Sequence, residues 1–107
     1  MRLAADIYQI TSQLPATERL GISTSLQTAA VQLPTVLAVG TKSGRSGFRQ
    51  ACISGRQSAA ELETLLILVQ QIYPTVPVDD LLNESSEIQS VLLNMAKRLA
   101  PKPPKTV

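Results

Sequence analysis

Residues 48–73 read FRQACISGRQSAAELETLLILVQQIY, and this stretch decides the fold of the 107-residue chain. Its small and apolar residues follow one another at alternating steps of four and three: Phe48, Cys52, Gly55, Ala59, Leu62, Leu66, Val69 and Tyr73. An α-helix with this spacing presents one continuous seam to neighbouring helices. The stretch therefore predicts a long packing helix at the centre of an all-α fold.

Two apolar segments exceed what the core of one bundle can bury. Residues 65–69 are consecutive apolar residues, and at about 100° per residue they face every direction around a helix. Residues 29–40 read AAVQLPTVLAVG, where Gln32 and Thr35 are the only polar side chains. We therefore predict a homo-oligomer whose subunits meet through both segments. The candidate interface residues are Val36, Leu37, Leu65, Ile67 and Leu68.

The N-terminal part of the chain predicts two further helices. The first spans residues 2–13 and ends before Pro15, which cannot continue a helix. Its seam consists of Leu3, Ile7, Ile10 and Leu14. The second spans residues 16–39 and contains Pro34 in its interior. Residues 41–47, with two glycines and two serines, then lead into the central helix as a tight loop or a frayed first helical turn.

The C-terminal part predicts the last helix and a tail. Pro74 and Pro77 forbid continuation of the central helix, and the last helix spans residues 80–99. The result is an up-and-down four-helix bundle over residues 1–99. Residues 100–107, APKPPKTV, are rich in proline and lysine, and we predict that this tail is disordered.

The composition fits one small domain without a membrane-spanning segment. Hydrophobic residues make up 44% and aromatic residues only 3%, so alanine and leucine must do most of the packing. Cys52 is the only cysteine, which excludes an internal disulfide. No run approaches the roughly 18 apolar residues that a membrane span needs, and the start lacks the apolar core of a secretion signal. We expect a cytoplasmic protein.

The residues for familiar catalytic chemistry are missing. The chain has no histidine, no cysteine pair and no glycine-rich phosphate loop. The carboxylates at Asp79, Asp80, Glu84 and Glu87 are explained by the dipole of the last helix, which favours negative charge near its N-terminus. We therefore expect no enzymatic activity, no metal and no cofactor.

One cluster of charges stands out on the central helix. Arg45, Arg49 and Arg56 fall within roughly 40° of one another around a helix, with Lys42 just upstream. No Asp or Glu lies three or four residues from any of these arginines, so local stability does not explain the stripe. Two interpretations stay open: a solvated or ion-paired face, or a phosphate-binding surface. The candidate nucleic-acid-binding residues are Lys42, Arg45, Arg49, Arg56, Lys102 and Lys105.

Three segments carry a family resemblance: YQITSQLPATERLGI (residues 8–22), AAVQLPTVLAVG (29–40) and SAAELE (58–63). They resemble the bacterial four-helix-bundle family named after proteins encoded in intervening sequences of large-subunit ribosomal RNA. The matching positions are Tyr8, Thr11, Pro15, Glu18, Gly21, Ala29, Ala30, Val31, Pro34, Ala38, Gly40, Phe48, Ser58, Glu61, Leu62 and Glu63. Their order and spacing hold over residues 8–73.

The resemblance implies a homopentameric ring of four-helix subunits. By fold the family includes the accessory variability determinant of diversity-generating retroelements, which binds a reverse transcriptase and nucleic acid through basic surface. This chain departs from the family at several polar positions. Where the family has two adjacent arginines, this chain has Gln27 and Thr28. Val36 stands in place of the family's asparagine, and Val39 in place of its glutamate. The family's usual stretch before the first helix also has no counterpart here, which predicts a short first helix.

Two classes of function follow for a protein of this kind. The first is a nucleic-acid-associated accessory subunit of a retroelement-type reverse transcriptase, with RNA or DNA held by its backbone. The second is a structural or protein-binding scaffold without a nucleic-acid role. For the first class, the scarcity of aromatic residues argues against stacking of side chains on nucleic-acid bases.

Overall fold

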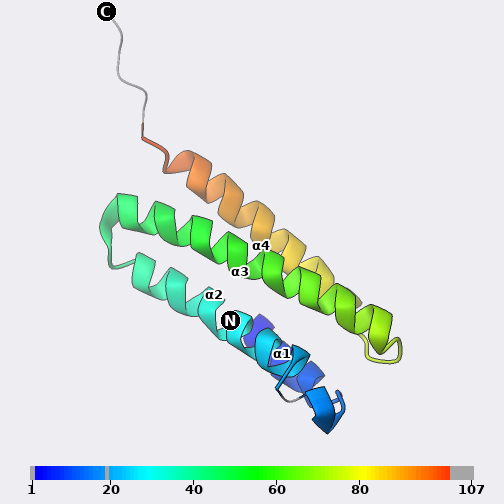
Figure 1. Ribbon diagram of the computed structural model, residues 1–107. Helices are drawn as coiled ribbons and strands as arrows, with labels where there is room; N and C mark the ends of the chain where they lie inside the picture. The colour runs from blue at the N-terminus through cyan, green and yellow to red at the C-terminus, as the bar shows by residue number, and fades with distance from the viewer. Residues whose placement is uncertain (1, 19, 102–107) are drawn as a thin grey trace, which may run out of the picture.

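The computed structural model describes residues 2–18 and 20–101. These residues form four α-helices and one 3₁₀ turn, and no strand occurs among them. The elements in chain order are α1 (Arg2–Thr11), the 3₁₀ turn η1 (Ala16–Glu18), α2 (Ile22–Gly40), α3 (Gly44–Ile72) and α4 (Asp79–Arg98). The predicted all-α class with four helices is therefore confirmed (Figure 1).

The long helix α3 is the centre of the arrangement, with α2 and α4 packed along it (Figure 1). Its predicted seam is the buried one: Cys52, Gly55, Ala59, Leu62, Leu66 and Val69 lie in the core. Phe48 and Tyr73 at the two ends are half-buried and pack against the core. In the described part of the chain, α2 and α4 each pack against α3 but not against each other. The space between them is left to α1.

Helix α1 fills only part of that space. It has 10 residues, against 19 in α2 and 20 in α4. It packs on both helices through Leu3, Ile7 and Ile10, which are buried. Gln27 of α2 fixes its C-terminal end, because the Gln27 Nε2 donates a hydrogen bond of 2.9 Å to the Thr11 Oγ1. The C-terminal halves of α2 and α4 have no such helix between them.

One predicted helix start is wrong, and the structure decides between two alternatives for another. The second helix begins at Ile22 rather than at residue 16, because η1 forms a separate 3₁₀ turn and Gly21 has a non-helical backbone at the N-cap. The central helix begins at Gly44, so most of the predicted turn over residues 41–47 is helical. Gly44 enters this helix with φ of 75°, a left-handed conformation that favours glycine.

The remaining boundaries lie close to the prediction. The first helix ends at Thr11 rather than at residue 13, and the last spans Asp79–Arg98 rather than residues 80–99. α2 continues through Pro34 as one helix. Most of the predicted tail, residues 102–107, lies outside the described residues, and so do Lys102 and Lys105.

The described chain leaves several large apolar side chains in solvent. They are Tyr8, Leu20, Val31, Val39, Ile67, Leu68, Ile72 and Val91. Contrary to the prediction from apolar runs, α2 is long and apolar enough to cross a membrane by length and composition, and only 28% of its most apolar window is buried. A core helix of a soluble protein passes the same test. Most residues of α2 are therefore not buried by the packing of the described chain.

Candidate nucleic-acid interface

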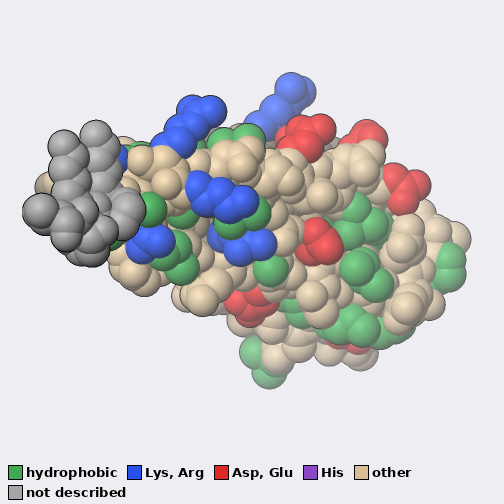
Figure 2. Space-filling model, turned by 90° about the horizontal axis from the view of Figure 1, so that it is seen from above, with side chains coloured by type: hydrophobic (Ala, Val, Ile, Leu, Met, Phe, Trp, Pro, Cys, Tyr) green, Lys and Arg blue, Asp and Glu red, His purple; other side chains and the backbone are tan. Residues whose placement is uncertain are grey.

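Basic side chains gather where α3 begins and α4 ends. Figure 2 shows Lys and Arg over one half of the face that it presents and most of the Asp and Glu over the other half. We call the half with Lys and Arg the basic end and define it by Arg45, Arg49, Arg56, Lys97 and Arg98. The fold therefore separates charges that nearly cancel in the sum of +2.

Two of these arginines complete the C-terminus of α4. The last four carbonyl groups of an α-helix have no partner within the helix. In α4, backbone N–H groups of residues 99 and 100 donate to the carbonyls of Met95 and Lys97. The other two carbonyls accept from α3: Arg45 Nη2 lies 2.9 Å from the Arg98 oxygen, and Arg49 Nε lies 3.2 Å from the Ala96 oxygen. All four carbonyls are thereby satisfied.

This geometry adds a structural role for two residues of the stripe. Local pairing within α3 does not explain the stripe, but contacts with the end of α4 give Arg45 and Arg49 a role in stability. Their guanidinium groups both satisfy carbonyls and place positive charge at the negative end of the α4 dipole. No local pattern predicts this role, because the partners lie 53 and 47 residues away.

Both arginines can still bind an anion while they donate to the carbonyls of α4. A guanidinium carries five N–H donors, and the structure assigns one donor of each arginine to a carbonyl. Arg45 is exposed and Arg49 is half-buried. The first turn of α3 contains no acidic residue, so the positive end of its dipole adds to the same field.

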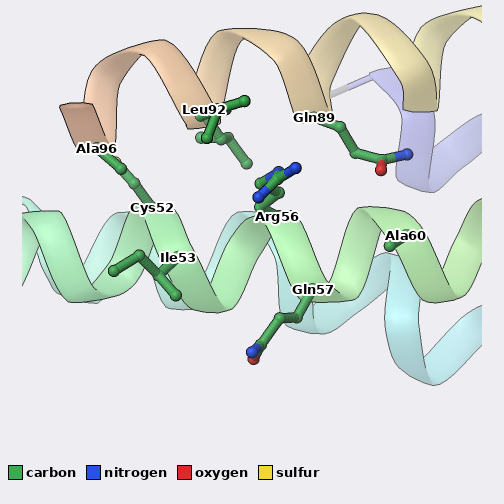
Figure 3. Close-up of a pocket in the computed structure, with 9 residues that line it drawn as sticks. Cys52, Ile53, Arg56, Gln57, Ala60, Gln89, Leu92 and Ala96 are labelled. Atoms are coloured by element: carbon green, nitrogen blue, oxygen red, sulfur yellow. The ribbon is translucent and has the colours of Figure 1, made fainter.

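Arg56 has a different setting from the two capping arginines. It is exposed, and within residues 2–18 and 20–101 the structure gives it no hydrogen-bond partner. It lines a cavity of about 220 Å³ between α3 and α4 together with Gln89 and Leu92, and Figure 3 shows its guanidinium in the space between these helices. Glu63, the carboxylate nearby, instead accepts a hydrogen bond of 2.6 Å from the Gln89 Nε2. Arg56 is thus the freest cation of the predicted stripe.

The other predicted cations divide into two groups. Lys42 is exposed in the turn between α2 and α3, next to the start of the stripe. Lys102 and Lys105 lie outside the described residues. Lys97 and Arg98 were not among the predicted site residues, because their position in the last turn of α4 is already explained by the helix dipole. Only the packing of α4 on α3 brings them beside the stripe.

The predicted interface residues do not form one surface in the single chain. Val36 lines a groove between α2 and α3, whereas Leu37 lines another groove between α2 and α4. Leu37 and Leu65 are half-buried and pack against the core. Ile67 and Leu68 are each 39% exposed on α3. Two apolar residues outside the predicted set, Val39 and Val91, are more exposed, at 61% and 55%.

Two titratable side chains among the described residues, Cys52 and Tyr73, have shifted pKa values. Within the part of the chain that the structure describes, no three His, Cys, Asp or Glu side chains cluster as metal ligands. Burial raises the pKa of the Cys52 thiol, which keeps it protonated and unreactive. A hydrogen bond to Glu18 raises the pKa of the Tyr73 phenol, and this pair ties η1 to the end of α3.

Comparison with known proteins gives one family. Residues 1–94 match the model of the family described as 23S rRNA-intervening sequence protein. No curated protein and no solved structure matches the chain. The matched region contains all four helices apart from the last turn of α4. The chain therefore belongs to the family of 23S rRNA-intervening sequence proteins.

Proposed function

We propose that this protein is a non-enzymatic, homo-oligomeric accessory protein that holds nucleic acid by its phosphate backbone. The observation that carries the proposal is the concentration of five cations at the basic end, with Arg56 free of any partner among the described residues. Guanidinium groups bind phosphate oxygens well because their donors form a planar fork. With 3% aromatic residues, stacking on bases contributes little, so we expect binding without sequence preference.

Oligomerisation would turn this modest site into a strong one. A few arginines per chain bind weakly, whereas several linked copies bind the same strand together. The exposed Ile67 and Leu68 and the largely unburied α2 support association between copies. The family resemblance suggests that the oligomer is a pentameric ring. It also suggests a reverse transcriptase of a retroelement as the protein partner. The proposed location is the cytoplasm.

A scaffold without a nucleic-acid role is the alternative, and a specific observation favours it. Arg45 and Arg49 have a structural task at the end of α4, so their presence does not require an anionic ligand. Arg56 has no such task, and it therefore separates the two functions.

The test uses matched variants that each lower the net charge by one. Arg56→Gln removes a cation from the basic end, and Asn83→Asp adds an anion on the exposed surface of the N-terminal part of α4. Fluorescence anisotropy at low salt with two RNA duplexes of unrelated sequence measures the affinity. We expect Arg56→Gln to weaken both duplexes several-fold and Asn83→Asp to leave them nearly unchanged. If both variants change the affinity equally, or if the wild type does not bind RNA, the nucleic-acid function is contradicted and the scaffold function remains.

A further inference from the structure

An open groove continues the space that α1 occupies between α2 and α4. It has a volume of about 480 Å³ and is lined by Leu37, Ala38, Thr41, Phe48, Glu87, Ile88, Val91, Leu92 and Met95. No residue of α1 lines it. At about 1.5 Å per residue, α2 is about 13 Å longer than α1, which is two to three helical turns. The groove thus lies beyond the N-terminal end of α1.

The lining of this groove is apolar. Only Thr41 and Glu87 contribute polar side chains. Val91 is 55% exposed, and Phe48, Ile88 and Met95 are half-buried around it. An apolar channel flanked by two helices is the usual seat of an amphipathic helix. In this protein α1 already packs between the N-terminal parts of the same two helices, with Leu3 and Ile7 buried.

We propose that the groove binds an amphipathic α-helix of a partner protein, placed end to end with α1. A second copy of this chain is a poorer occupant, because the seams of its own helices are already buried: Ile7 of α1, Leu33 of α2, Leu62 of α3 and Leu92 of α4 lie in the core. Such a copy can offer a flat face, but residues 2–18 and 20–101 form no helix that is left unpacked for insertion. A partner that supplies a separate helix meets the shape of the groove.

The charges around the groove fix the direction and the polar face of the occupant. The first turn of α1 has no acidic residue and begins with the exposed Arg2, so this end is positive. The negative C-terminal end of the occupant is therefore favoured next to Arg2. Glu87, at the wall of the groove, is exposed and favours a lysine or arginine on the partner helix.

A designed peptide of about 12 residues serves as the probe, since this length spans the open turns. It carries leucines at alternating steps of three and four, one lysine beside them and a free C-terminal carboxylate, with a fluorophore at its N-terminus. We expect saturable binding to the wild-type protein. A peptide of the same composition with its leucines spread around the helix should not bind, because it has no apolar face.

Two groove variants and one matched control locate the binding. Val91→Glu places a charge in the groove and should weaken binding by about tenfold or more. Ala38→Trp should do the same by filling the groove without a charge. Leu20→Glu is the control, because Leu20 is a 95% exposed apolar residue that lines neither this groove nor the groove between α2 and α3. The peptide should bind this control as it binds the wild type.

The direction is tested with a spin label on either end of the peptide. A label at the C-terminus should broaden the amide signals of Arg2 and Leu3, and a label at the N-terminus should leave them sharp. The reverse pattern contradicts the proposed polarity. The proposal is also overturned if the wild type does not bind the peptide or if Leu20→Glu abolishes binding. A change in the oligomer size of the free protein in Val91→Glu would overturn it as well, because a second copy would then occupy the groove.

Discussion

At the scale of single residues, Arg45 and Arg49 combine two tasks. Each donates to a carbonyl at the end of α4, and each adds positive charge to the basic end. A change at either residue therefore alters folding as well as binding. Arg56 adds charge alone, because the structure gives it no partner among the described residues.

This difference predicts unequal costs in stability. Arg45→Gln with Arg49→Gln should lower the free energy of unfolding by about 1–3 kcal/mol, since two carbonyls lose charged donors and the bond to the Ala96 carbonyl is partly buried. Arg56→Gln should change it by less than about 0.5 kcal/mol, as exposed substitutions without partners usually do. Urea denaturation measures both. Equal losses for the pair and for Arg56 would contradict the capping role.

Tyr73 predicts a pH dependence. Its neutral phenol donates a hydrogen bond of 2.7 Å to the Glu18 Oε1, and this bond raises the phenol pKa above its usual value of about 10. The folded state therefore holds the proton more tightly than the unfolded state does. The stabilisation is complete below about pH 10 and is lost as pH rises through the raised pKa.

The matched variant is Tyr73→Phe, which removes the hydroxyl and keeps the ring. We expect a lower Tm than the wild type near pH 8 and a smaller difference well above pH 10. Thermal melts over this pH range measure the effect. A constant difference at all pH values would mean that the hydrogen bond to Glu18 does not contribute.

The candidate site shows what sequence reasoning can and cannot supply. Spacing on one helix was enough to place Arg45, Arg49 and Arg56 on a common stripe. Lys97 and Arg98 join them only through the packing of α4 on α3, and the capping bonds span about half of the chain. Contacts of this kind depend on tertiary geometry, which periodicity within a helix does not contain.

At the scale of elements, the seams of the helices were predictable because burial follows the helical period. The buried residues of α3 are those of the predicted seam together with Ala51, and the two ends of the seam are half-buried. The starts of α2 and α3 were not predictable, because they depend on backbone choices at Gly21 and Gly44. The helical spacing of apolar residues continues through such positions in the sequence even where the helix itself ends.

The turn between α2 and α3 depends on Gly40. A Cβ at this position would collide with the Cβ of Ala51, an atom close to the backbone that cannot swing away. Gly40→Ala should therefore push α2 from α3 and lower the free energy of unfolding by about 1–3 kcal/mol. At Gly55 the nearest atoms are the ends of Leu92, Leu37 and Leu33, which can move.

Gly55→Ala is therefore the matched variant for Gly40→Ala. Its new methyl group meets flexible leucine tips at 3.2–3.4 Å, and alanine also favours the helix over glycine. We expect a change within about 1 kcal/mol of the wild type in the same urea titration. A larger loss at Gly55 than at Gly40 would contradict this account of the turn.

At the scale of the whole molecule, exposed apolar surface predicts association. Leu68 is 39% exposed on α3 next to the equally exposed Ile67. Leu68→Glu should reduce the size of the oligomer, because a carboxylate buried between subunits has no partner there. Gln71→Glu adds the same charge nearby without removing an apolar side chain and should keep the oligomer intact. Light scattering reports both, and an 11.5 kDa wild-type species at micromolar concentration would contradict the proposed assembly.

The most direct test of the proposed function is the salt dependence of binding to an RNA or DNA duplex. If the basic end holds phosphates, the logarithm of the affinity should fall linearly with the logarithm of the salt concentration, by about 0.9 for each phosphate contact on duplex DNA. Arg56→Gln should reduce this slope by about 0.9 or more, with its stability nearly unchanged. A slope that is the same in Arg56→Gln and the wild type, or an affinity that does not depend on salt, would contradict the account.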